Sequence, residues 1–352
     1  MNYSLVYDSS NPACDVPNPP AVDISLITCT LISIPAYFLV FLAFRKKTPD
    51  NFKIYKTKLM VCVIANICLE LTITILVKPV VYFPEIALRA GGIHILRHST
   101  GAVSFFIVFI AEIVSAYCLL GLFNYRMTVV VEPWKYIYNL KILKIIRIWR
   151  IFMHVSLILS LLSVYFILQV FLDQPVTKLN NSTLSTLPEY SCLSFLVVPT
   201  LSEQSLSTWL NMQAFNFLII IPNSLMFWLA ILLVYTTAKF LSLLRKDAHI
   251  STFFMNFHKL YLQSLIIQLV VHSIIVGIPA LCYTAAAICN IGHSVFALLS
   301  IIVISLHGSV LSLLIIWMNK PLRHNLIGYF SKDLKTHPVQ MSSFTNSSTA
   351  MS

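Results

Sequence analysis

The sequence predicts an all-α membrane protein, a bundle of seven transmembrane helices with the N-terminus outside and the C-terminus inside. Its 352 residues are 58% hydrophobic and 11% charged, so a water-soluble fold would have too few polar side chains to cover its surface. Apolar windows of about 20 residues or more occur seven times, and each can cross roughly 30 Å of hydrocarbon as a helix. These windows are residues 24–44, 59–83, 102–130, 148–172, 214–234, 260–283 and 294–317.

The segments between the windows set the orientation. Lys and Arg gather after the first window, between the third and fourth, between the fifth and sixth, and after the seventh. Only four lie on the opposite side, namely Lys78, Arg89, Arg97 and Lys178. By the positive-inside rule, the basic side is the inner side. The net charge of +11 is therefore first a topology signal and second a hint of an acidic membrane or partner surface, and it does not imply nucleic-acid binding.

Outside the windows the chain carries no soluble domain and no repeat. We expect an extracellular tail over 1–23 without a cleavable signal peptide, the helix bundle over 24–318 and a cytoplasmic tail over 319–352. Residues 173–211 are expected to be a loop. Beyond the last window, Leu322, Leu326, Tyr329 and Phe330 share one face of a short amphipathic helix that fits the inner leaflet, with a disordered basic tail as the alternative. The Ser- and Thr-rich end is expected to be disordered and open to phosphorylation.

Three cysteines and three asparagines are expected on the outer side. Cys14, Cys192 and Cys289 lie where disulfides persist, so Cys14 can pair with either of the others, and the sequence does not choose between them. Acceptor sequons for glycosylation begin at Asn2, Asn180 and Asn181.

Four ionisable residues lie deep inside the windows, about 10 to 13 residues from the start of each, which places them near the bilayer midplane. They are Glu70, Glu112, His272 and His307. An isolated charge at that depth costs on the order of 2.5 to 3.5 kcal/mol, so these groups should face one another, with Glu112 paired to one of the histidines. Gly308 leaves room for a neighbouring helix to approach. The layer of Glu70, Glu112, His307 and Gly308 is interpreted either as a conformational switch or as neutral, partnered groups that only aid packing.

Catalytic and metal-binding patterns are missing from the sequence. No H-E-x-x-H pattern or nucleophile elbow occurs, so we expect neither an enzyme nor a metal or other cofactor. A transporter would show paired inverted repeats, although Glu70 and Glu112 keep that alternative open.

Arg126 stands at the inner end of the third window, in "LFNYRMTVVVEPW". One interpretation is a snorkelling side chain. The other is a cation that closes the inner side of a receptor at rest and meets a G protein when the receptor opens.

The motifs together resemble a known family across the whole membrane region. Thr48-Pro49, "LFNYR", "LQSLIIQLVVHSIIVGIP" and "LHGSVLSLLIIWMNKPLR" resemble the nematode serpentine chemoreceptors, most closely serpentine receptor class H. The pair His307-Gly308, with Pro321 and Arg323 beyond it, is the most specific element. The resemblance implies an olfactory type of G-protein-coupled receptor in the plasma membrane, typically on sensory cilia. Its partners would be a small environmental molecule, a heterotrimeric G protein and the lipid bilayer.

The chain departs from this family at three points. Asn124 and Tyr125 precede Arg126 where the family often has an acidic residue and Asn. The chain therefore has no carboxylate at this place to form an acidic lock on Arg126, and Asn124 can hydrogen-bond the guanidinium instead. Leu322 stands where a tyrosine usually separates Pro321 from Arg323. Residues 90–105 contain no cysteine, so the disulfide that many seven-helix receptors form at the top of helix 3 cannot form.

The expected ligand site is the outer half of the bundle, lined by apolar and aromatic side chains with a few polar ones. Pro222 and Pro279 are natural bends for the movement of helices 5 and 6. An accessory receptor-like protein without its own ligand is a further alternative. The residues expected to line the ligand site are Phe105, Phe109, Glu112, Phe215, Asn216, His272, His293 and Phe296.

Overall fold

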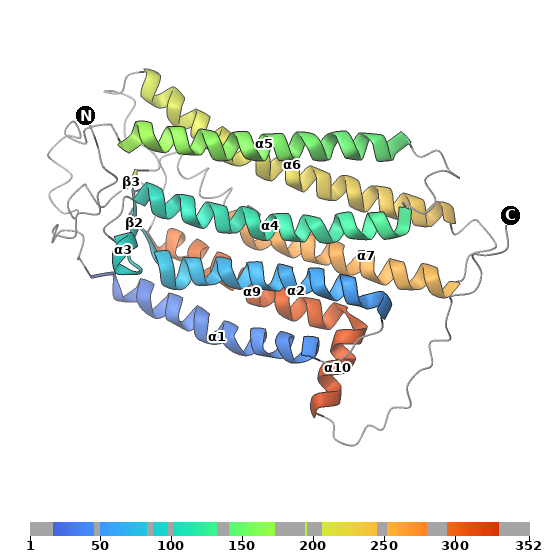
Figure 1. Ribbon diagram of the computed structural model, residues 1–352. Coiled ribbons are helices and arrows are strands. Elements are labelled where there is room, and N and C mark those ends of the chain that lie inside the picture. Colours follow the sequence, from blue (N-terminus) through green and yellow to red (C-terminus); the bar gives the residue numbers. More distant parts are fainter. Residues whose placement is uncertain are drawn as a thin grey trace, which may run out of the picture.

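The computed structural model describes residues 17–45, 50–82, 87–97, 101–131, 141–172, 194–195, 206–244, 252–279 and 294–330. Long helices run side by side along one axis, each opposite in direction to the one before it (Figure 1). They are α1 (Pro20–Arg45), α2 (Asp50–Leu71), α4 (Gly101–Val131), α5 (Lys141–Leu172), α6 (Leu206–Leu244), α7 (Thr252–His272) and α9 (Ser294–Met318). Two short helices, α3 (His94–Arg97) and α10 (Lys320–Phe330), lie at opposite ends of the bundle.

Six helical segments are long and apolar enough to cross a membrane. They belong to α1, α2, α4, α6, α7 and α9, so six of the seven predicted spans are confirmed by length and composition among the described residues. The fourth predicted span falls in α5, a helix of 32 residues whose crossing of the membrane stays a prediction. Hydroxyl side chains within the spans bond back to carbonyls one turn earlier, as Thr74 does to Glu70 and Thr237 to Leu233. This satisfies their donors inside a helix, as an apolar solvent requires.

Two of the long helices end in a wider turn just before a proline. The π-helical segment η2 (Thr72–Val77) follows α2 and is followed by Lys78 and Pro79, while η6 (Ser273–Gly277) follows α7 and is followed by Ile278 and Pro279. A proline has no N–H and crowds the preceding turn, so the helix widens there. η6 therefore lies where a bend at Pro279 was predicted. At Pro222, by contrast, α6 continues as a helix.

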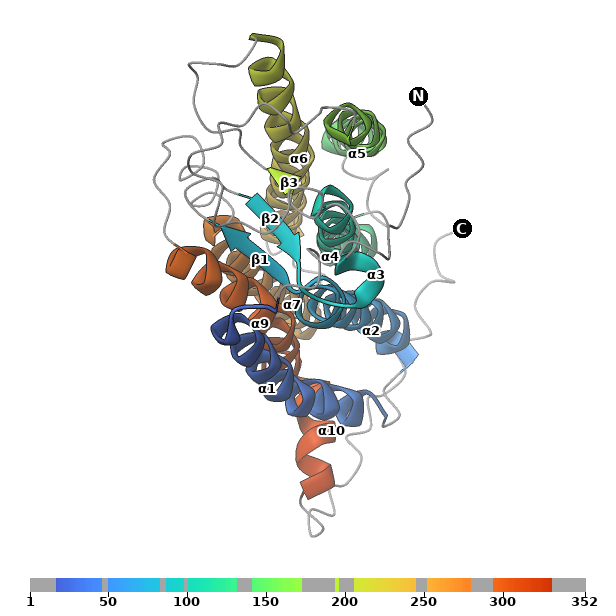
Figure 2. The same ribbon diagram turned by 90° about the vertical axis from the view of Figure 1, so that its left-hand side faces the viewer.

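A small antiparallel sheet covers one end of the bundle, in the order β1-β2-β3. Its strands are β1 (Pro79–Tyr82), β2 (Ala87–Ala90) and β3 (Ser194–Phe195), with Ala87 opposite Phe195. Figure 2 looks onto this end and shows β1 and β2 lying between α9 and α4. We call it the sheet end, and the opposite end, where α9 turns into α10, the α10 end.

The sheet corrects two sequence predictions. The window 59–83 is not one helix to its end, because helical structure stops at Val77 and the next residues form β1. Residues 173–211 are not all loop, because β3 and the first turns of α6 fall within them. Strand β3 ties this connection to β2 by backbone hydrogen bonds, so the two connections at the sheet end are held together without the disulfide that the sequence rules out.

The core runs through the middle of the bundle. One large cluster of buried side chains joins all seven long helices, with Ile146 and Met153 contributed by α5, and extends to Leu322 of α10. α5 packs mainly on α6 and much less on α4. Asn325 on α10 donates a hydrogen bond to the Ala43 carbonyl at the end of α1, 3.2 Å away, which fixes the direction of α10. That α10 forms is confirmed, whereas its place at a membrane interface stays a prediction.

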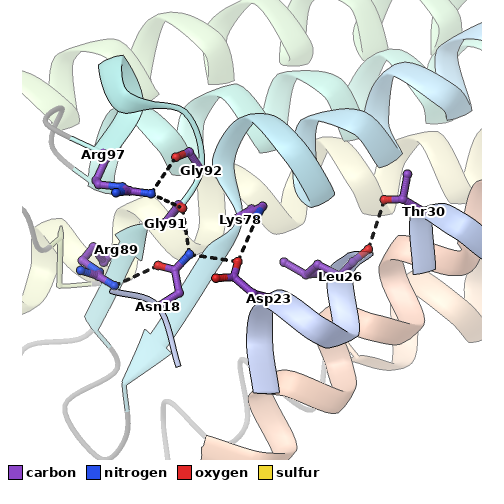
Figure 3. Close-up of polar contacts among 9 residues, drawn as sticks. All are labelled: Asn18, Asp23, Leu26, Thr30, Lys78, Arg89, Gly91, Gly92 and Arg97. Carbon is purple, nitrogen blue, oxygen red and sulfur yellow. Dashed lines mark hydrogen bonds and ion pairs between the residues drawn. The ribbon is translucent and has the colours of Figure 1, made fainter. Parts of the chain in front are cut away.

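Polar residues around Asn18 link the start of α1 to the sheet end (Figure 3). The Asn18 amide donates to Asp23 and to the Gly91 carbonyl, and its oxygen accepts from Arg89, at 3.2, 2.9 and 3.0 Å. Asp23 also pairs with Lys78 at 3.0 Å. A Cβ on Gly91 would overlap the Asn18 side chain, so glycine at this position leaves the space in which Asn18 makes its contacts.

Asn18→Ala is expected to lower the free energy of unfolding by about 1–3 kcal/mol, because it removes the hub of this network and one acceptor of the buried Arg89. Thermal denaturation of the purified protein measures the change. Asp23→Asn is the control, since a partly exposed ion pair contributes no more than about 1 kcal/mol. Equal losses for the two variants would contradict a central role for Asn18.

Candidate functional site

Glu70 is buried halfway along the bundle, at 3% exposure. The Tyr37 hydroxyl, on α1, donates a hydrogen bond to Glu70 Oε2 at 2.5 Å. A neutral donor of this kind lets the carboxyl group sit between two helices without a second charge. The contact therefore joins α1 to α2 at mid-depth, where the sequence placed an ionisable residue.

Gly308 on α9 packs against the same contact. A Cβ added there would overlap the Tyr37 hydroxyl and would lie 3.1 Å from the Asn66 carbonyl oxygen and 3.2 Å from Asn66 Cβ. The missing side chain thus lets α9 approach both α1 and α2, which is what the sequence predicted for Gly308. Small residues serve the same purpose where helices pack closely in membranes.

Asn66 extends this arrangement to a third neighbour of α2. The Ser115 hydroxyl on α4 donates to Asn66 Oδ1 at 2.5 Å, and both residues are buried. Asn66 precedes Glu70 by one helical turn, so the two side chains lie on the same face of α2. One face of α2 therefore carries polar contacts to α1 and to α4.

His272 and His307 form a hydrogen-bonded pair between α7 and α9. His272 Nδ1 and His307 Nε2 are 2.7 Å apart, and the rings meet edge to face with centroids 4.7 Å apart. His307 is fully buried. Such a bond needs one nitrogen that carries a proton and one that does not, so the two rings cannot both be charged while it lasts.

The sequence predicted that Glu112 would pair with His272 or with His307. For His307 this prediction is wrong. His307 Nε2 meets His272, and His307 Nδ1 has no hydrogen-bond partner among the described residues. Glu112 is half-buried on α4. We call the polar residues at this depth the mid-bundle layer: Tyr37, Asn66, Glu70, Ser115, His272 and His307.

His307→Phe tests the histidine pair. The variant is expected to lose about 1–3 kcal/mol of folding free energy, because a buried hydrogen bond disappears and His272 loses its partner. Thermal denaturation and cellular signalling are both measured. Ser309→Ala is the matched control, since that buried hydroxyl bonds only within its own helix, to the Leu306 carbonyl. Unchanged stability and signalling in His307→Phe would remove this residue from the mechanism.

Arg126 occupies a cage of aromatic rings near the α10 end. Its side chain is 6% exposed, and the guanidinium carbon lies 3.9 Å from the Tyr55 ring centroid and 3.8 Å from that of Tyr261. The two rings meet edge to face, 5.3 Å apart. They come from α2 and α7, while Arg126 comes from α4. We call this arrangement the tyrosine cage, and it joins three helices at one cation.

Among the described residues, aromatic rings and no carboxylate surround the Arg126 guanidinium. A cation over the face of an aromatic ring is attracted by the ring quadrupole, by about 0.5 to 2 kcal/mol depending on its exposure. Tyr125, which stands where the family often has Asn, stacks on Tyr55 with centroids 6.1 Å apart. The expected hydrogen bond from Arg126 to Asn124 is not formed. Asn124 Oδ1 instead accepts a hydrogen bond from Arg150 Nη1 on α5, at 3.1 Å.

The other predicted positions are only partly described. Among the expected ligand-site residues, Phe109 is buried, Phe296 is exposed at one end of α9, and Phe105, Phe215 and Asn216 are described as helical backbone only. The ligand site thus stays a prediction. On α10, Pro321 is half-buried and Arg323 is exposed. His293, Cys14, Cys192, Cys289, Asn2, Asn180 and Asn181 lie outside the described residues. Four cysteines expected in the membrane, Cys29, Cys62, Cys68 and Cys118, are free.

Several site residues escaped the sequence analysis. A search for ionisable groups finds Glu70, His307 and Arg126, but it passes over Tyr37 and Tyr261, whose polar role depends on which helix they face. Asn66 carried a usable signal, because it stands one turn from Glu70 on the same helix face.

Comparison with known proteins gives one finding. A family model described as "Serpentine type 7TM GPCR chemoreceptor Srh" matches residues 17–332. Curated proteins and solved structures give no match. The matched region covers every long helix, the tyrosine cage and the mid-bundle layer.

Proposed function

We propose a chemosensory receptor function from one premise: the chain belongs to the serpentine-type seven-transmembrane G-protein-coupled chemoreceptor family Srh. This is a family of multi-pass membrane receptors and not of enzymes. In the proposal, a small environmental molecule binds in the half of the bundle nearer the sheet end. A heterotrimeric G protein then engages the α10 end.

The proposed orientation follows the basic residues. They gather at the α10 end, which becomes the cytoplasmic end, with α5 as the seventh crossing. The sheet end then faces outward, and the receptor lies in the plasma membrane, on sensory cilia. Fusion of a reporter that is active only in the cytoplasm to either end of the chain tests this orientation.

The observation that carries the proposal is the tyrosine cage. A receptor needs an element near its cytoplasmic end that has two arrangements, one of them favoured by ligand. The tyrosine cage connects α4 with α7, and separation of these two helices would pull Tyr261 from Arg126. The closed cage then represents the resting state, and the released guanidinium becomes available to a G protein.

The mid-bundle layer lies between the proposed ligand site and the tyrosine cage. It reaches α7 through His272, the last residue of that helix before η6. Tyr261 lies earlier on α7, nearer the α10 end. A ligand that favours a different arrangement of α7 and α9 would therefore act on Tyr261 through one rigid helix. Differential affinity for the two arrangements supplies the energy for this shift.

The test is a calcium or cAMP readout in a heterologous cell exposed to a chemically diverse set of small molecules. We expect at least one ligand-dependent response, and we expect Arg126→Ala to abolish it while surface expression is kept. Lys259→Ala is the matched control, because this exposed lysine lies two residues from Tyr261 without contacting Arg126. If the cells stay silent while a labelled solute accumulates in proteoliposomes, the receptor proposal is replaced by a transporter. Co-purification with another receptor, again without a response, would indicate an accessory protein.

A further inference from the structure

A cavity of about 170 Å³ lies between α4, α5 and α6, in the half of the bundle toward the α10 end. Leu229 and Leu233 of α6 form its floor. Its walls come from α4 and α5, which run alongside each other with few direct contacts (Figure 1). On the α4 side, a Cβ added to Gly121 would meet no atom within 4 Å. We call this cavity the lateral groove.

The lateral groove contains a cation with no acidic partner. Arg150 lines it and donates one hydrogen bond to Asn124 Oδ1. Among the described residues, no carboxylate lies within ion-pairing distance of Arg150. A guanidinium has five N–H donors and always keeps its charge, so the neutral Asn124 leaves most of its capacity unused. Arg150 stands only two residues into the apolar window 148–172, so it lies at the level where the headgroups of a lipid leaflet are expected.

An exposed polar pair shows that the lateral groove opens to the side of the bundle. The Tyr117 hydroxyl and His154 Nε2 are 3.2 Å apart, and both residues are exposed although they line the cavity. Tyr117 belongs to a segment that can span the membrane. An exposed polar pair at such a place faces lipid, so a molecule with both polar and apolar parts would suit it better than hydrocarbon alone.

A basic stripe on α5 leads from the α10 end to the lateral groove. Lys144 and Arg147 are exposed and precede Arg150 at intervals of three residues, which places them along one side of the helix. The positive charge therefore begins in the first turn of α5, at the α10 end, and continues along the helix into the cavity. This pattern is complementary to the anionic headgroups of a lipid leaflet.

We propose that the lateral groove binds one anionic phospholipid from the leaflet at the basic end of the bundle. The phosphate group accepts hydrogen bonds from Arg150, with Arg147 and Lys144 beside it. An acyl chain occupies the open space beside Gly121, above Leu229 and Leu233. A phosphate meets a guanidinium in the two-pronged geometry that makes such contacts strong.

The site bears on the tyrosine cage through α4. Asn124, which holds Arg150, stands two residues before Arg126. A phosphate that draws Arg150 toward the headgroups weakens the hydrogen bond from Arg150 to Asn124. The segment of α4 that carries Arg126 is then held less firmly to α5. This consequence rests on the proposed receptor function, whereas lipid binding itself does not.

The experiment uses the full-length chain in nanodiscs that contain phosphatidylcholine with an increasing fraction of phosphatidylglycerol. Native mass spectrometry counts the anionic lipids that stay bound when the nanodisc is removed. We expect one retained phosphatidylglycerol, with an affinity at least about tenfold above that for phosphatidylcholine. Arg150→Gln should remove this preference, and Gly121→Leu should prevent retention by filling the open space beside Gly121. Lys239→Gln, an exposed basic residue at the same end, should change nothing.

Three results would overturn the proposal. Equal loss in Lys239→Gln would show unspecific attraction to the basic end. Equal retention of both lipids by the wild-type chain would show that the charge of the headgroup is not recognised. Full retention in both Arg150→Gln and Gly121→Leu would place the lipid elsewhere. Circular dichroism and size-exclusion profiles confirm that each variant is folded, and the two variants change the groove by independent means.

Discussion

Gly308→Ala is expected to lower the free energy of unfolding and to reduce the amount of folded receptor, because an overpacking cost of about 1–3 kcal/mol exceeds the roughly 0.5–1 kcal/mol by which alanine favours a helix. The added methyl group would overlap the Tyr37 hydroxyl and press on the backbone of α2 at Asn66. A flexible side chain could move aside, but the Asn66 carbonyl belongs to a buried helix and cannot move alone. The two close contacts with Asn66 therefore require a shift of a few tenths of an ångström between α9 and α2, and the Tyr37 hydroxyl must leave its place, so its bond to Glu70 stretches or breaks. Thermal denaturation in detergent measures the loss.

The matched control is Gly121→Ala, which makes the same chemical change on α4. There the new methyl group meets no atom, and alanine favours a helix over glycine by about 0.5–1 kcal/mol. The two substitutions should shift the midpoint of thermal denaturation in opposite directions. A stabilising Gly308→Ala, or equal losses in both variants, would contradict the close approach of α9 to α2.

The helices of this fold could be predicted because lipid leaves the backbone little choice. Each window of the sequence overlaps one long helix of the structure over most of its length, since each donor and acceptor must be satisfied within its own segment. The ends were less predictable. α2 begins at Asp50, well before its window, because the lysines in its first turns lower the mean hydropathy without breaking the helix.

The sheet and the π segments could not be predicted with the same means. β1 comes from "PVVY", an apolar stretch that continues the window of α2, so hydropathy does not separate it from the helix. Strand β3 has two residues and forms only because β2 lies beside it. The prolines were visible, but whether a helix bends, widens or continues at a proline depends on its neighbours, as Pro222 and Pro279 show.

The residues of the candidate site that could be predicted are the ionisable ones, because an ionisable side chain is unusual within an apolar window. Glu70 and His307 stand out in apolar windows, and the depth argument placed them at one level. Their partners depend on helix rotation, which hydropathy does not report. Asn124 was expected to be able to hydrogen-bond Arg126, yet Tyr55 and Tyr261, remote from Arg126 in the sequence, surround its guanidinium.

Tyr261→Leu is expected to raise ligand-independent signalling about fivefold, if the tyrosine cage holds the resting receptor as proposed. Loss of one cation–π contact with a buried guanidinium weakens the closed arrangement by about 1 kcal/mol. When the active state is rare, a change of that size multiplies its population by nearly the full Boltzmann factor. Basal cAMP or calcium signalling, divided by the amount of receptor at the cell surface, measures the effect.

Tyr235→Leu is the matched control, because this exposed tyrosine lies on α6 and contacts Lys239 instead of Arg126. It should leave basal signalling unchanged. Arg126→Ala combined with Tyr261→Leu should be silent, since the released arginine is the group that meets the G protein. If Tyr261→Leu lowers basal signalling while surface expression is kept, Tyr261 supports the active arrangement, and the resting-state role of the tyrosine cage is wrong. If the double variant signals as strongly as Tyr261→Leu alone, the helix movement matters and Arg126 itself does not.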